Sequence, residues 1–179
     1  MCNPKKMHDE QWLTHLMRTY FNDMFNYGKR FCRDEALVKD CIQEVFISLW
    51  QRRDTANEIL SAKYYFLRAI KNKVLKTLDS RSRLHHTHVL SGEYDFIDDF
   101  SVEQTIIARE LALQNGNRLR SILSKLPKRE KEVIYLKYYQ LLDNGQIAQL
   151  MNINRQSVYN LLSGSIVKLR QCWQNEFVT

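Results

Sequence analysis

Glycine and proline are scarce in this chain of 179 residues, which holds five glycines and two prolines. Runs of β-branched residues are also few, whereas Leu, Ile, Lys, Glu and Gln are abundant. This composition argues against a sheet-rich or loop-rich protein and predicts an all-α fold. A chain of this length can form one domain or two small ones.

The four cysteines are scattered without a Cys-x-x-Cys pair, at positions 2, 32, 41 and 172. A disulfide framework is therefore not expected, and buried reduced thiols in a cytosolic protein fit the spacing better. The N-terminus lacks an apolar run long enough for a signal peptide, and no segment approaches the roughly 18 apolar residues that span a bilayer. The sequence predicts a soluble cytoplasmic protein with no stable membrane insertion.

Charge is distributed unevenly over the chain, whose formal net charge is +7. Residues 1–84 hold 16 Lys and Arg against 10 Asp and Glu, residues 85–104 hold none against 5, and residues 105–179 hold 11 against 5. Two basic blocks, each of net charge +6, therefore flank an acidic stretch of net charge −5. The basic blocks indicate a polyanionic partner, most simply nucleic acid.

A helix predicted from Asp34 to about Trp50 or Arg52 has an unusual outer face. Its inner face is apolar, with Val38, Cys41, Ile42, Val45, Phe46 and Leu49. Its outer face carries four side chains at helical spacing, Asp40, Gln43, Glu44 and Ile47. In so basic a chain, carboxylates beside an exposed isoleucine suit docking on a protein better than docking on nucleic acid. An ordinary solvated acidic edge has the same pattern, so both interpretations stay open here.

A helix predicted from Ala62 to about Leu78 carries cations opposite its apolar face. This cationic stripe consists of Lys63, Arg68, Lys71, Lys73 and Lys76, interleaved with Tyr64 and Asn72. Such a stripe is either a solvated surface or a nucleic-acid face, in which cations contact phosphates and nearby aromatic side chains stack on unpaired bases.

Helical periodicity disappears between Asp79 and Phe100. Three histidines, His85, His86 and His88, offer metal-binding groups, but no cysteine or carboxylate at a fixed helical spacing completes a site. A linker is therefore the better interpretation. Residues 93–100 alternate carboxylates with large apolar side chains, which suits a flexible strand that binds something basic.

Further helices are predicted at Asp9–Phe31, from a capping box at Ser101 to Leu126, and from Pro127 onward. The last of these carries apolar side chains at Val133, Ile134, Leu136 and Tyr138.

A helix-turn-helix pattern follows, with a helix at 146–151, a turn at 152–154 and a second helix from Arg155 to Leu169. The inner positions are apolar, namely Ile147, Ala148, Leu150, Ile153, Val158 and Leu162. Polar side chains point outward at the start of the second helix, namely Arg155, Gln156, Tyr159 and Asn160. Such side chains bond to base edges and phosphates, although short three-helix units that do not bind DNA share the pattern.

Two motifs resemble the extracytoplasmic-function sigma factors of bacterial RNA polymerase. The run DCIQEVFISLW at 40–50 is similar to the family's conserved region 2. The run LPKREKEV at 126–133, followed by QIA at 146–148 and by Ser157 and Val158, is similar to region 4. The two motifs stand in the family's order and at a suitable separation.

The resemblance covers the chain from about Leu13 to Trp173. It implies an all-α protein of two small helical domains joined by an acidic linker. A region 2-like domain is expected at 8–80, the linker at 81–102 and a region 4-like helix-turn-helix domain at 103–173.

The resemblance also implies roles for individual residues. One set would bind core RNA polymerase, namely Asp40, Gln43, Glu44 and Ile47. A second would handle minus-10 promoter DNA, namely Arg52, Arg53, Asn57, Lys63, Tyr64, Arg68, Lys71, Asn72 and Lys76. A third would contact the minus-35 element, namely Arg155, Gln156, Tyr159, Asn160 and Lys168. The acidic linker would thread toward the RNA-exit path of the polymerase.

Some positions depart from the family pattern. Tyr159 stands where a basic residue is frequent, and Gly164-Ser165 replaces a usual Arg-Ala pair. The recognition helix thus has fewer cations, and minus-35 affinity is expected to depend on Arg155 and on Lys168 and Arg170 further along.

The predicted function is promoter recognition by a sigma factor, with core RNA polymerase and promoter DNA as partners and neither catalysis nor a cofactor of its own. Members of the family are commonly held by an anti-sigma factor, which this sequence does not identify. Two rival hypotheses are a stand-alone helix-turn-helix transcriptional regulator, which would need a dimerisation or ligand domain in residues 1–100, and a metal-dependent enzyme built on the three histidines and carboxylates near Asp98.

Overall fold

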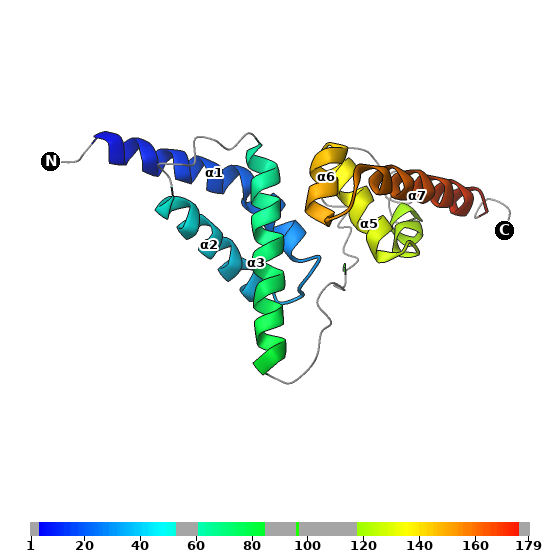
Figure 1. The fold of residues 1–179 in the computed structure, drawn as a ribbon, viewed down its shortest axis with the longest axis horizontal. Helices are drawn as coiled ribbons and strands as arrows, with labels where there is room; N and C mark the ends of the chain where they lie inside the picture. Colours follow the sequence, from blue (N-terminus) through cyan, green and yellow to red (C-terminus); the bar gives the residue numbers. More distant parts are fainter. Residues whose placement is uncertain (1–3, 53–60, 85–95, 97–117, 176–179) are drawn as a thin grey trace. The chain divides into compact units, whose positions relative to one another are not determined.

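The computed structural model describes residues 4–52, 61–84, 96 and 118–175. The chain divides into two compact units, Met1–Ile97 and Asp98–Thr179, each of which is described by itself. Every regular element within the described ranges is helical (Figure 1). The all-α fold predicted from composition is confirmed.

Three long helices build the first unit, namely α1 (Pro4–Gly28), α2 (Glu35–Gln51) and α3 (Ala62–Leu84). Each helix packs against the other two. The core includes the fully buried side chains of Tyr27, Phe66, Met24, Ile42, Leu49, Leu67, Ile70 and Val38. Burying one large apolar side chain contributes about 1.5–3 kcal/mol, so this core holds the outer faces of α2 and α3 in a fixed relation.

The start of α2 agrees with its prediction from sequence. Asp34 is the N-cap, and its Oδ1 accepts a hydrogen bond from the backbone N–H of Leu37 at 3.0 Å. The buried residues of α2 are Leu37, Val38, Cys41, Ile42, Val45, Phe46 and Leu49. The predicted inner face is therefore confirmed.

The other two helices differ from their predicted bounds. The helix predicted at Asp9–Phe31 begins at Pro4 and ends at Gly28, where the backbone tightens and the N–H of Phe31 bonds the Gly28 carbonyl at 3.0 Å. The end predicted near Leu78 was wrong, because α3 continues to Leu84. Its last turns are polar, and Arg83 and Asp79 form an ion pair at 2.5 Å along the helix, which supports helical structure without apolar periodicity.

The second unit contains a helical stretch at 118–124, then α5 (Lys128–Ile134), the π-helical turn η3 (Tyr135–Tyr139), α6 (Asn144–Met151) and α7 (Arg155–Asn175). Both α5 and α6 pack against α7. The core of this unit includes Ile122, Leu123, Val133, Leu136, Ile147 and Val158. The capping box predicted at Ser101 lies outside the described residues.

The π-helical turn changes the helix that was predicted from Pro127. The N–H of Gln140 bonds the carbonyl of Tyr135 at 3.1 Å, five residues back, so the turn is wider than in an α-helix. Leu136 stays buried, but Tyr138, predicted on the apolar face, is 54% exposed. The wider turn thus moves one side chain of the predicted apolar face into solvent.

Candidate protein and nucleic-acid interfaces

The outer face of α2 carries the side chains predicted to bind a protein, and all of them are exposed. These residues, called the α2 face below, are Asp40, Gln43, Glu44 and Ile47. Ile47 is 57% exposed, although the same helix buries seven residues on its other side. An exposed isoleucine beside two carboxylates is poorly suited to water and well suited to a protein partner.

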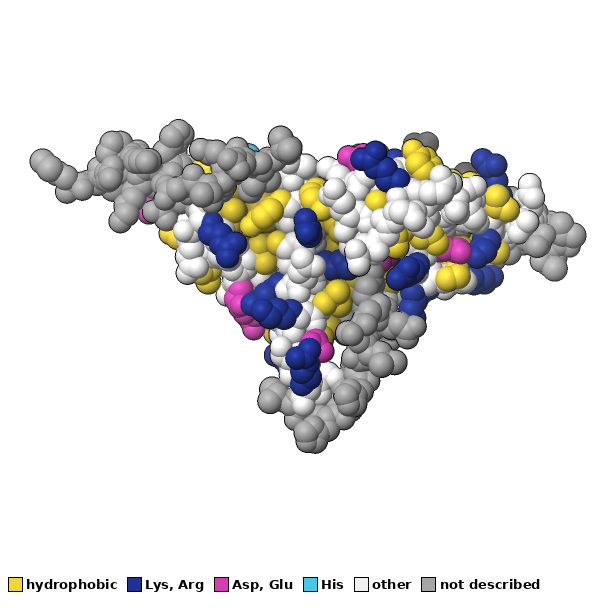
Figure 2. Space-filling view, in the orientation of Figure 1, with side chains coloured by type: hydrophobic (Ala, Val, Ile, Leu, Met, Phe, Trp, Pro, Cys, Tyr) yellow, Lys and Arg dark blue, Asp and Glu magenta, His cyan; other side chains and the backbone are white. Residues whose placement is uncertain are grey.

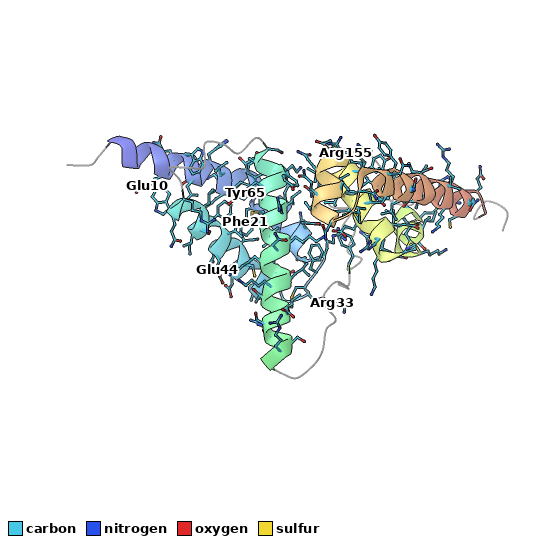
Figure 3. The ribbon with its side chains drawn as sticks, viewed as in Figure 1. Glu10, Phe21, Arg33, Glu44, Tyr65 and Arg155 are labelled. Carbon is cyan, nitrogen blue, oxygen red and sulfur yellow. The ribbon has the colours of Figure 1, made fainter. Side chains whose placement is uncertain are left out.

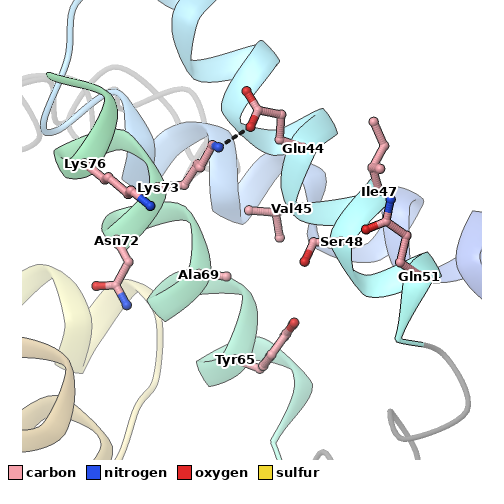
Figure 4. Close-up of a pocket in the computed structure, with 10 residues that line it drawn as sticks. All are labelled: Glu44, Val45, Ile47, Ser48, Gln51, Tyr65, Ala69, Asn72, Lys73 and Lys76. Atoms are coloured by element: carbon pink, nitrogen blue, oxygen red, sulfur yellow. Dashed lines mark ion pairs between the residues drawn. The ribbon is translucent and has the colours of Figure 1, made fainter. Parts of the chain in front are cut away.

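A groove runs between α2 and α3 beside this face, with a cavity volume of about 490 Å³ (Figure 4). Its walls are formed by Glu44, Val45, Ile47, Ser48 and Gln51 of α2 and by Tyr65, Ala69, Asn72, Lys73 and Lys76 of α3. An ion pair between Glu44 and Lys73 joins the two walls. Sequence analysis places these two residues on separate faces and does not reveal this contact.

The cationic stripe of α3 is not uniform. In Figure 2, Lys and Arg side chains follow the visible face of α3, with acidic side chains beside them. Lys63 pairs with Asp23 of α1 at 3.1 Å, and Nη1 of Arg68 donates to the Tyr64 hydroxyl at 3.4 Å. Asn72 and Lys76 are exposed. Several of the residues predicted to contact DNA thus form ion pairs or hydrogen bonds within the first unit.

Lys71 differs most from its prediction as a surface cation. Its side chain is 6% exposed, and its ammonium lies 5.5 Å from the centre of the Phe31 ring. Among the other residues predicted to handle minus-10 DNA, Arg52 is exposed at the end of α2, whereas Arg53 and Asn57 lie outside the described residues.

Phe96, within the segment predicted as an acidic linker, packs on the first unit. Its ring meets that of Phe31 edge to face at 5.8 Å, and the Arg30 guanidinium lies 5.9 Å from its centre. Phe96 is 4% exposed. The alternation of aromatic and acidic residues predicted a basic binding partner for this stretch, and for Phe96 the neighbouring cation belongs to the same chain.

The helix-turn-helix lies where the sequence predicts it, but α6 begins at Asn144 rather than at 146 and α7 continues past Leu169 to Asn175. Of the predicted inner positions, Ile153 is only partly buried, and the others are buried, namely Ile147, Ala148, Leu150, Val158 and Leu162. Asp143 caps α6 through a capping box with Gln146, and Asn152 at φ 53° makes the left-handed turn. Asn154 then caps α7, its Oδ1 accepting from the Ser157 N–H at 2.7 Å. The pattern Asp143-x-x-Gln146 is visible in the sequence and is the signal from which this start could have been predicted.

The outward side chains at the start of α7 are exposed together, namely Arg155, Gln156, Tyr159 and Asn160. Nε2 of Gln156 donates to Oδ1 of Asn160 at 3.1 Å, and Tyr159 is 56% exposed. Arg155 lies against the first turn of α6, since a Cβ added at Gly145 would be 2.9 Å from its Nη2 (Figure 3). The N-terminal end of α7 therefore exposes a guanidinium, two amide side chains and a phenol to solvent.

Lys168 is separated from this group and has a different partner. Its ammonium bonds Oε1 of Glu130 on α5 at 2.6 Å, and the Glu130 side chain is 13% exposed. The predicted DNA contact thus takes part in an ion pair between two helices of the second unit.

Family models of two conserved regions match the chain in order. The model of sigma-70 region 2 matches residues 16–84, and the model of sigma-70 region 4 matches residues 116–169. Together they span most of the chain. The chain belongs to the sigma-70 family. The resemblance to extracytoplasmic-function sigma factors, seen in the motifs at 40–50 and 126–133, is confirmed.

Relatives of this sigma factor are themselves sigma factors. The chain is 29% identical to the RNA polymerase sigma factor SigF of Mycobacterium tuberculosis over 101 residues, which are 55% of this chain and 39% of that protein. It is 26% identical to the RNA polymerase sigma-F factor of Kitasatospora aureofaciens over 109 residues, which are 58% of this chain and 36% of that protein. The chain thus spans less than half the length of these relatives.

The fold of this sigma factor is also found in a solved structure. The sigma factor RpoE of Bartonella quintana, crystallised with the anti-sigma factor NepR, aligns with a TM-score of 0.57 at 12% identity. The alignment covers 92% of this chain and 96% of that one. At this identity the likeness concerns the fold.

The region 2 match ends at Leu84, which is also where α3 ends, so the polar last turns of α3 belong to that conserved region. The region 4 match includes α6 and α7 as far as residue 169.

Within the described ranges of this sigma factor, no group of three or more His, Cys, Asp or Glu side chains could hold a metal ion. The three histidines considered as metal ligands lie outside those ranges. None of the described helices combines the length and apolarity needed to cross a membrane.

Proposed function

We propose that this protein is an extracytoplasmic-function sigma factor that binds core RNA polymerase and directs it to promoters. The observation that carries this proposal is the α2 face, where Ile47 is 57% exposed beside the carboxylates of Asp40 and Glu44 in a protein with net charge +7. A DNA-binding protein gains nothing from such a face, since carboxylates repel phosphates. A large protein partner explains it, and the helix-turn-helix in the same chain supplies contact with DNA.

The α2 face is the proposed contact with polymerase. The proposed minus-10 surface consists of the exposed groups at the end of α2 and along α3, namely Arg52, Arg68, Asn72 and Lys76, together with Tyr64, Lys63, Arg53 and Asn57. Cations there would bind phosphates, and the tyrosine would stack on an unpaired base. Lys71 would support this surface through the Phe31 ring rather than touch DNA itself.

The proposed minus-35 surface is the start of α7. Arg155, Gln156 and Asn160 would bond to base edges or phosphates in the major groove, and Tyr159 would contact them through its ring and hydroxyl. Lys168 would contribute by holding α7 against α5.

Phosphodiester chemistry would belong to the polymerase, so we infer no catalysis by this chain. As a subunit of the transcription apparatus, it would act in the cytoplasm. An anti-sigma factor is a further candidate partner, because the RpoE structure that shares the fold was solved with NepR.

Run-off transcription with purified core polymerase on genomic fragments of the source organism tests the proposal. Specific transcripts should appear only when this protein is added. Asp40→Arg should reduce their yield more than about tenfold, because the reversed charge opposes docking at the α2 face. Glu10→Arg reverses an exposed charge on α1 that is not one of the four residues of the α2 face, and it should leave the yield unchanged. Specific DNA binding without any affinity for core polymerase would favour the stand-alone regulator instead.

A further inference from the structure

The ion pair between Glu44 and Lys73 connects the α2 face to α3. The Glu44 side chain is 56% exposed, and that of Lys73 is 33% exposed. Figure 4 places the pair on the groove between the two helices, with Ile47 further along α2. The carboxylate of the α2 face at position 44 is therefore held by a residue of another helix.

The other carboxylate of the α2 face is in a different situation. Asp40 is exposed, and its side chain makes no ion pair or hydrogen bond with another described residue. A glutamate has a longer side chain than an aspartate and more rotamers to lose when it is fixed at an interface. If an ion pair already restricts the Glu44 side chain in the free protein, less conformational entropy is lost when that side chain is fixed at the interface.

We propose that Lys73 is a positioning residue of the α2 face, which fixes the Glu44 carboxylate for polymerase binding and does not itself contact polymerase. This inference rests on the proposed function. It gives Lys73 a role distinct from the rest of the cationic stripe, because its ammonium is directed to a carboxylate of α2 rather than to a nucleic acid. Both side chains of the pair are partly exposed to solvent, so removing it should change folding stability little.

A double-mutant cycle separates positioning from direct contact. The variants are Glu44→Gln, Lys73→Met and the two combined, and the measurement is affinity for core polymerase at fixed ionic strength. Each single variant should bind about fivefold more weakly, and the double variant should bind no more weakly than Glu44→Gln alone, since Lys73 acts only through Glu44. Additive losses, of about 25-fold in the double variant, would overturn the proposal because Lys73 would then contact polymerase itself. Unchanged or tighter binding of Lys73→Met would overturn it as well.

Two further variants exclude a merely structural effect. Lys73→Arg keeps the cation and should restore most of the affinity, with thermal unfolding unchanged across the set. Arg81→Met is a matched control, because Arg81 of α3 pairs with Asp34, the N-cap of α2, at 3.6 Å. This variant removes an ion pair between the same two helices and should leave polymerase affinity unchanged. Equal losses with Arg81→Met would contradict positioning by Lys73.

Asp40→Arg distinguishes the two proposals. If that variant and the wild type bind core polymerase equally, or if the wild type does not bind, the proposed function fails. If Asp40→Arg weakens binding but the cycle is additive, only the role of Lys73 fails.

Discussion

Cys41 lies on the buried side of α2 and is 2% exposed. Burial raises the pKa of the Cys41 thiol, and the Thr77 hydroxyl at 3.7 Å opposes that rise only in part. Since the thiolate is the reactive form, Cys41 should react slowly with alkylating agents at pH 8. Cys172 on α7 is partly exposed and should react first.

Peptide mass spectrometry after timed treatment of a Cys2→Ser protein with iodoacetamide measures both rates. Denaturant should make the two rates similar, because it removes the burial that protects Cys41. Equal rates in the native protein would contradict the buried position of this thiol.

Gly28 is closely packed and Gly164 is not, so replacing each with alanine should change the free energy of unfolding in opposite directions. A Cβ added at Gly28 would lie 2.7 Å from Cγ1 of Val38 and 3.3 Å from Cγ1 of Ile70, where all three helices of the first unit meet. Gly28→Ala should therefore cost about 1–3 kcal/mol of unfolding free energy. Gly164, inside α7, has no such neighbour within 4 Å, and Gly164→Ala should stabilise by about 0.5–1 kcal/mol through helix propensity. Urea unfolding of both variants checks the signs, and a destabilised Gly164→Ala protein would show that position 164 is not open.

At the scale of single elements, Lys168 ties α7 to α5 through Glu130 at 2.6 Å. Lys168→Met should lower the stability of the second unit by about 1–3 kcal/mol, because it leaves the largely buried Glu130 carboxylate without its cation. Arg170→Met removes the same charge from an exposed site on α7 and is the matched control for stability, with no change in the free energy of unfolding expected. Urea unfolding is the measurement, together with binding to minus-35 DNA. A tenfold loss of DNA affinity in Lys168→Met with unchanged stability would instead make Lys168 a DNA contact.

The sequence is sufficient to predict α2 and the helix-turn-helix because their signals are local. An N-cap, an apolar period and a turn each depend on neighbours within one or two turns of helix. The end of α3 depends on contacts that are polar and partly distant, such as the pairing of Arg81 with Asp34 at 3.6 Å. No apolar period marks such a stretch, so its helical structure was not predicted.

For the candidate surfaces, the sequence predicts which side chains are exposed but not which partners they contact. Helical spacing correctly places Ile47 and Tyr159 on exposed faces. Helical spacing does not identify the partner of a side chain when that partner comes from another part of the chain. This is why the contacts of Lys71 with Phe31, of Lys73 with Glu44 and of Lys168 with Glu130 appear only in the folded protein.

At the scale of the whole molecule, one residue of the acidic stretch between the two basic blocks, Phe96, packs on the first unit. Phe96 belongs to that unit, whose limits are Met1 and Ile97. Its contacts with Phe31 and Arg30 mean that the chain leaving the first unit is attached to it beyond the end of α3. The linker that the family resemblance implies at 81–102 was predicted without this attachment.

Phe96→Ala should therefore destabilise the first unit and leave the second unchanged. Loss of a buried phenylalanine typically costs about 3–5 kcal/mol in a core, and we expect about 2–4 kcal/mol here because Phe96 packs from outside the helices. Two compact units can unfold separately, so calorimetry should show one transition moved to lower temperature and the other in place. Tyr138→Ala, which removes a ring 54% exposed on the second unit, is the control and should move neither transition. If Phe96→Ala also leaves both transitions in place, its packing on Phe31 contributes nothing to the first unit and the stretch is a plain linker.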